Sequence, residues 1–136
     1  MSGFVLLRTA KAVMATVLGD SALSSAVGGR IYDIRPQASA LPCITLTGVS
    51  ATAGDHKTRQ GQTVTVTLSC WSTYEGRIEV LGLGRSVYNL FNEKPLTVES
   101  ATASVVRCSA GNVIEDGDAV TRRIDIVLTL IVRSSS

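Results

Sequence analysis

In two stretches of the sequence, Thr63–Trp71 and Arg123–Arg133, every second residue is apolar. The residues between them are mostly polar in both stretches. Side chains on a β-strand point to opposite faces in turn, so this period of two predicts strands with one face in the core. Each buried aliphatic side chain contributes about 1.5 to 3 kcal/mol, so a slip of one residue would turn most of that stability outward. The core-facing residues would be Val64, Val66, Leu68, Cys70, Ile124, Ile126, Leu128, Leu130 and Val132.

Helical patterns precede these strands. Apolar residues recur at three- and four-residue steps from Phe4 to Leu18, which predicts an amphipathic helix. Asp20 can cap a short second helix over Ser21–Val27. Gly28 and Gly29 would close that helix, because paired glycines readily adopt the positive φ angles that end helices.

A third helix is predicted from Ser72 to Asn92. Ser72–Glu75 has the pattern of a capping box, and Pro95 marks the end of the helix. Gly82 and Gly84 lie inside it, and each costs about 1 kcal/mol relative to alanine. Close packing against a strand or a neighbouring helix is the expected compensation.

Shorter extended segments complete the pattern. They are expected at Arg30–Ile34, Cys43–Val49, Leu96–Val98 and Ala103–Cys108. With 136 residues, the chain suits one domain over residues 1–136. The order of elements predicts an α+β fold, in which an antiparallel or mixed β-sheet carries helices packed on one face.

The composition excludes several classes of partner. The net charge is +2 and the basic residues are scattered, so a nucleic-acid surface is not expected. No stretch has the ~20 apolar residues of a membrane helix, and the N-terminal segment lacks the pattern of a signal peptide. Cys43, Cys70 and Cys108 are odd in number and lie in strand-like segments, which favours reduced, buried thiols.

Catalytic and metal-binding patterns are missing from the sequence. The only histidine, His56, lies in a glycine-flanked loop, where a general base would be poorly held. Three separated cysteines and this histidine match no zinc spacing, and the turn Glu115–Asp118 is too short for a calcium loop. We therefore expect no catalytic residue, no metal and no cofactor.

The segment Ser50–Gly61 is the only long irregular stretch. It contains Asp55, His56, Lys57 and Arg59, which form either a solvated loop tip or a segment that becomes ordered when it docks on a partner. Two interpretations also remain for the threonine face of the strand at 63–71. It either faces solvent or packs against a neighbouring subunit.

Three motifs, in this order, resemble a known family. They are the segment from Gly28 to Asp33, the segment Leu41–Leu46 with Pro42, and the strand end Ser69–Ser72 with Trp71, which leads into the helix at 76–90. The chain is similar to the tail terminator, or tail-completion, proteins of long-tailed bacteriophages, prophages and gene transfer agents. The resemblance implies structural roles for Gly28, Gly29, Arg30, Pro42 and Trp71.

The resemblance also implies a function. Members of this family form a sixfold ring that caps the head-proximal end of the tail tube, stops further tube addition and offers a surface to the head connector. The implied partners are copies of the chain itself, the tail tube protein and head-tail connector proteins. The protein would be part of the virion tail, assembled in the cytoplasm of the bacterial host. From its length and charge, the segment Ser50–Gly61, with Asp55, His56, Lys57 and Arg59, is the candidate docking element.

Three other interpretations stay open. The nearest is another ring-forming connector, such as a head-completion or tube protein. A small enzyme would require an acid/base pair in a pocket, and a ligand-binding domain would require a deep apolar cavity.

Overall fold

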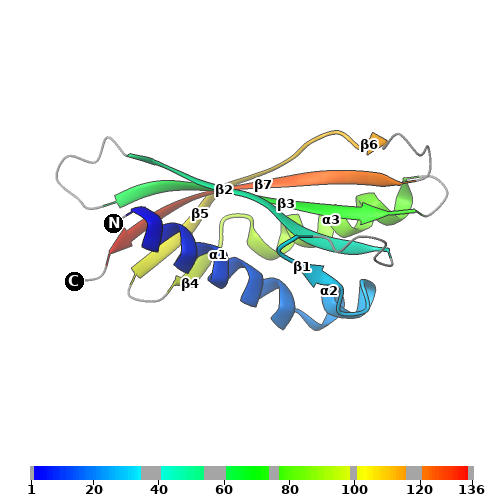
Figure 1. Ribbon diagram of the computed structural model, residues 1–136, viewed down its shortest axis with the longest axis horizontal. Helices are drawn as coiled ribbons and strands as arrows, with labels where there is room; N and C mark the ends of the chain where they lie inside the picture. Colours follow the sequence, from blue (N-terminus) through cyan, green and yellow to red (C-terminus); the bar gives the residue numbers. More distant parts are fainter. Residues whose placement is uncertain are drawn as a thin grey trace.

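The computed structural model describes residues 2–34, 41–53, 61–73, 77–98, 101–115 and 121–134, in which three helices pack against one mixed sheet (Figure 1). The predicted α+β class with helices on one face is confirmed. The elements are α1 Ser2–Gly19, α2 Ser21–Ala26, β1 Ile31–Tyr32, β2 Cys43–Ala53, β3 Gly61–Ser72, α3 Ile78–Phe91, β4 Pro95–Val98, β5 Ala101–Ala110, β6 Ile114–Glu115 and β7 Arg122–Ser134.

The two alternating segments of the sequence form the centre of the sheet. The strand order is β1-β2-β3-β7-β5-β4, and β3 pairs antiparallel with β7 in one unbroken register from Gly61 opposite Arg133 to Ser72 opposite Arg122. All the predicted inward residues of these two strands are buried. The predicted core-facing rows of these two strands are therefore confirmed.

The margins of the sheet are short strands. β1 pairs with β2 in parallel, whereas every other pair is antiparallel. β6, which the sequence did not predict, pairs with the start of β7 (Figure 1). Gly111 N donates to Asp125 O at 3.0 Å between the end of β5 and β6, so these two strands follow one another along the same edge of β7.

The core lies between one face of the sheet and the helices α1 and α3. α1 contacts both β2 and β4, which lie on opposite sides of the central pair, whereas α3 contacts β3, β5 and β7. No described helix is long and apolar enough to cross a membrane. The buried core side chains of α1 and α3 are Val13, Val17, Val80, Leu83, Val87 and Phe91, and α2 adds Leu23.

The predicted start of the third helix is wrong. Ser72 is the last residue of β3, and α3 begins only at Ile78, with Arg77 at the N-cap and no side-chain capping bond. Ser72 pairs with Arg122 in the sheet, and its hydroxyl donates to Glu79 Oε1. Because Ser72 is paired in the sheet, it does not act as the N-cap of a helix.

The hairpin strands are longer than expected. β2 continues to Ala53 and β3 begins at Gly61, so the first residues of the predicted loop, Ser50–Ala53, belong to a strand. Residues 54–60, which include Asp55, His56, Lys57 and Arg59, lie outside the described residues. The second helix is confirmed, because Asp20 Oδ2 accepts from Leu23 N at 3.0 Å.

The two glycines of α3 have different surroundings. A Cβ added at Gly84 would lie 3.1 Å from Ile124 Cγ2 and 3.5 Å from Ile126 Cδ1, so Gly84 allows the helix to approach β7 closely. A Cβ at Gly82 would meet nothing within 4 Å. The expected packing compensation is confirmed for Gly84 and wrong for Gly82.

The two glycines provide a matched pair of variants. Gly82→Ala should raise the free energy of unfolding by about 0.5 to 1 kcal/mol, because alanine is the better helix former and the site has space. Gly84→Ala should gain less or lose stability, because its methyl group presses on the buried Ile124. Urea unfolding of both variants measures the difference, and an equal gain at both positions would contradict the close approach.

Candidate interaction surface

The face of the sheet that turns away from the helices carries mostly hydroxyl side chains. Its composition follows from the alternation of the strands, which sends every second residue to this side. α1 and α3 both pack on the opposite face. The described residues on this open face include Thr45, Thr47, Ser50, Thr63, Thr65, Thr67, Ser69, Trp71, Arg123, Asp125, Val127, Thr129 and Ile131.

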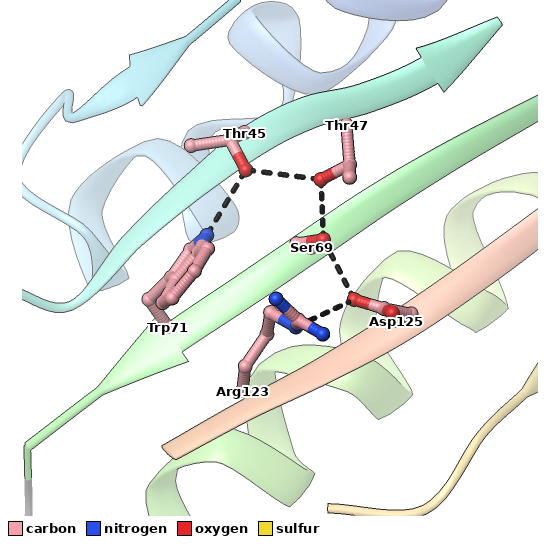
Figure 2. A network of polar contacts seen from close by, with 6 residues as sticks. All are labelled: Thr45, Thr47, Ser69, Trp71, Arg123 and Asp125. Carbon is pink, nitrogen blue, oxygen red and sulfur yellow. Dashed lines mark hydrogen bonds and ion pairs between the residues drawn. The ribbon is translucent and has the colours of Figure 1, made fainter. Parts of the chain in front are cut away.

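Polar side chains at one end of the open face form a chain of hydrogen bonds across β2, β3 and β7 (Figure 2). Trp71 Nε1 donates to Thr45 Oγ1 at 3.0 Å, and the Thr45 and Thr47 hydroxyls are 3.3 Å apart. Thr47 shares a hydrogen bond with Ser69, whose Oγ donates to Asp125 Oδ1 at 2.7 Å. Hydroxyl groups can both donate and accept, so the chain is continuous.

Arg123 closes this chain into a ring of contacts. Its Nε lies 3.2 Å from Asp125 Oδ1, an ion-pair distance at which the N–H is not aligned for a hydrogen bond. Its guanidinium carbon lies 5.3 Å from the centroid of the Trp71 ring, which is cation–π geometry (Figure 2). We call Thr45, Thr47, Ser69, Trp71, Arg123 and Asp125 the outer-face network.

The outer-face network links β2, β3 and β7 on the face of the sheet that lacks helices. Ser69 is 0% exposed and Thr45 is 4% exposed, so their hydroxyl groups are removed from water and need partners within the protein. The network supplies those partners. It therefore makes this end of the open face a rigid polar surface, with Trp71 and Arg123 partly exposed upon it.

Two of the sequence motifs meet where α2 turns into the sheet. Gly28 and Gly29 have φ angles of +60° and +76°, which glycine adopts without strain. The Arg30 guanidinium folds back over Gly28, where a Cβ would lie 2.8 Å from Nη1. Arg30 Nε then donates to Pro42 O at 3.0 Å, so the glycine turn is tied to the residue that precedes β2.

The third motif lies beside these two. Trp71 lies opposite Cys43 in the β2–β3 ladder, and Cys43 directly follows Pro42. The next residue, Ile44, donates its N–H to Arg30 O at 3.0 Å. Gly28, Gly29, Arg30, Pro42 and Trp71 therefore lie at one end of the sheet.

Sequence reasoning missed most of the outer-face network. Arg123 and Asp125 were placed correctly on the polar face of the last strand, but no role was inferred for them. Only the register of that strand on β3, which the structure shows, puts Asp125 opposite Ser69 and Arg123 opposite Trp71. Thr45 and Thr47 required knowledge of the β2 register, which shifts between Leu46 and Gly48.

The cysteines are free and buried, as expected. Burial, together with smaller effects of the nearby Cys43 and Asp125, raises the pKa of the Cys70 thiol to about 12. Burial alone raises the pKa of Cys108 to about 11. Both thiols therefore remain protonated and unreactive near neutral pH.

Within the described ranges, no three His, Cys, Asp or Glu side chains are grouped closely enough to hold a metal ion. The charged cluster beside α3 joins structural elements instead. Glu115 Oε1 lies 3.6 Å from Arg77 Nη2 and 3.6 Å from Arg122 Nη2, which links α3, β6 and β7.

Breaking the outer-face network should weaken the fold. Asp125→Ala and Ser69→Ala should each lower the free energy of unfolding by about 1 to 2 kcal/mol, since each removes a partner from a buried polar group. The double variant should lose less than the sum of the two, because both changes remove the same bond. Asp33→Ala, at an exposed position, should change it by less than about 0.5 kcal/mol.

Alkylation by iodoacetamide tests the state of the thiols. At pH 8, Cys108 in the folded protein should react at least about a hundredfold more slowly than in the urea-unfolded chain, and Cys70 more slowly still, because thiolate is the reacting form. Mass spectrometry of the alkylated peptides gives both rates. Folded and unfolded rates that agree would show that these thiols are accessible.

Comparison with known proteins places the chain in a family. A family model described as Tail completion protein gp17 matches residues 11–133. No curated protein sequence matches with significance.

Two solved structures have the same fold. One is a protein in the virion of a native gene transfer agent particle, which is 21% identical with a TM-score of 0.76 over 91% of this chain and 93% of that one. The other is 11% identical with a TM-score of 0.63 over 98% of this chain and 96% of that one. Because the family model spans most of the sequence, the chain belongs to the Tail completion protein gp17 family, whose members are structural virion proteins and not enzymes.

Proposed function

We propose that this protein is a tail terminator, which caps the head-proximal end of the tail tube as a ring, stops tube polymerisation and offers the attachment surface for the head connector. The observation that carries the proposal is the family match over residues 11–133. The fold shared with a gene transfer agent virion protein over nearly the whole of both chains supports it.

The structure is suited to a function that depends on shape. Its central strands are fixed in register, and its two sides differ, with helices on one and an open hydroxyl-rich face on the other. A ring requires each copy to present two different patches to its two neighbours. The two faces of this sheet differ, and so do its two edges, which end in β1 and β4. Such a subunit offers two different patches without any chemical step.

Termination then follows from a difference between the two faces of the ring. One face must complement the last ring of the tube, whereas the other must lack the surface on which a further tube subunit would add. Tube proteins of similar size would instead present matching faces and stack. This contrast separates the proposal from the nearest alternative, another ring-forming connector.

The docking element in this proposal is the connection between β2 and β3. The register places it at the end of the hairpin where Ala53 lies opposite Gln62, whereas Trp71 and the outer-face network lie at the other end, beside Cys43. Asp55, His56, Lys57 and Arg59 in this connection supply charged and polar groups for a partner.

Self-assembly of the purified protein tests the ring. Native mass spectrometry at increasing concentration, or on isolated tail ends if the free protein is monomeric, should reveal a six-copy species. Electron microscopy of the same sample should show single rings. Stacked tubes would favour a tube protein and contradict termination.

Deletion of His56–Arg59 tests the docking element. The purified variant should keep its folding cooperativity, because the described pairing of β2 with β3 ends at Ala53 opposite Gln62. It should fail to join tails to heads. A variant in which the same four residues become glycine and serine separates the effect of charge from that of loop length. Unchanged yields of complete particles from both variants would remove this role for the segment.

A further inference from the structure

The sheet has two open margins among the described residues. β1 covers β2 only at Ile44 and Thr45, which leaves the outer edge of Leu46–Ala53 without a strand partner. β4 pairs with β5 only from Ala101 to Ser104, which leaves the outer edge of Val105–Ala110 without a described strand partner. Such edges present rows of backbone N–H and C=O groups that can pair with another strand.

Both open segments begin at an irregularity in the ladder. The register of β2 on β3 shifts between Leu46 and Gly48, and that of β5 on β7 shifts between Val105 and Arg107. Bulges of this kind twist an edge and restrict which strand can pair with it. The bulges at the two edges therefore favour pairing with a strand of matching twist and disfavour non-specific strand pairing.

The strand directions are compatible with pairing between the two margins. Three successive antiparallel pairs lead from β2 through β3 and β7 to β5, so β2 and β5 run in opposite directions. A second copy generated by rotation about an axis roughly along the strands keeps these directions. Its β2 would therefore lie antiparallel to the β5 of the first copy.

The side chains of the two margins also match face for face. On the helix side, Val49 and Ala51 of β2 correspond to Cys108 and Ala110 of β5, which are apolar or small. On the open side, both margins carry exposed polar residues, with Ser50 on β2 and with Arg107 and Ser109 on β5. Joining them would place apolar beside apolar and polar beside polar, as in a continuous sheet.

We propose that the β2 edge of one copy, Leu46–Ala53, pairs antiparallel with the β5 edge of the next copy, Val105–Ala110, so that the sheets of the ring join edge to edge. This inference rests on the ring of the proposed function and names the surfaces that close it. The contact is heterologous, as ring closure requires, and it removes the open margins of every copy.

Amide hydrogen exchange tests this interface directly, because it reads backbone pairing without knowledge of the exact register. Exchange is compared between the free protein and the ring, either in solution or on isolated tail ends. About every second amide should become protected in both Leu46–Ala53 and Val105–Ala110, since alternate N–H groups of an edge strand point outward.

Three outcomes would overturn the inference. Rings in which neither edge gains protection would contradict it and leave the proposed function standing. Protection at one edge alone would show that a different protein, such as a tube or head component, covers that edge. Failure to find any ring, in solution or on tail ends, would remove both the proposed function and this interface.

Charge variants on the open face give a second test that leaves the monomer intact, because Ser50 and Ser109 are both exposed. Ser50→Lys combined with Ser109→Lys should lower the ring population by about tenfold or more, whereas Ser50→Lys combined with Ser109→Glu should restore it. Asn89→Lys, at an exposed position on α3, is the matched control and should have no effect. Equal ring populations in all three variants would contradict the proposed pairing.

Discussion

The pairing of β3 with β7 is the constraint on which the other parts of the structure depend. Its unbroken register from Gly61 to Ser72 places an aliphatic row on one side and a mainly polar row on the other. The aliphatic row forms the floor of the core beneath α1 and α3. The polar row carries the outer-face network, which also holds β2 in place. A slip of one residue would exchange the two rows and destroy both arrangements.

In this two-sided construction, the described polar groups of the outer-face network and the buried thiols belong to the fold. The polar groups at the buried end of the open face bond to one another, and the buried thiols stay protonated. The tail completion family to which the chain belongs is structural and not enzymatic. In our proposal, specificity comes from the shapes of the two faces and of the two sheet margins.

The sequence predicted the parts of the fold that depend on strong local periodicity. The strands at 63–71 and 123–133, the Asp20 cap and the glycine turn all have local signals and were placed correctly. The start of α3 was misplaced because Ser72 had two possible partners, and only the sheet register shows that it pairs with Arg122. The outer-face network was missed because it joins three strands whose relative register cannot be read from any one of them. The candidate docking residues at 55–59 remain a prediction.

The central claim is that this protein ends tail growth by occupying the head-proximal end of the tube. Electron microscopy of particles assembled in its absence tests that claim most directly, with the length of each tail tube as the measured quantity. The account predicts tubes of uncontrolled length without attached heads, and restoration of uniform tails when the protein is supplied. Tails of normal length joined to heads in its absence would contradict it.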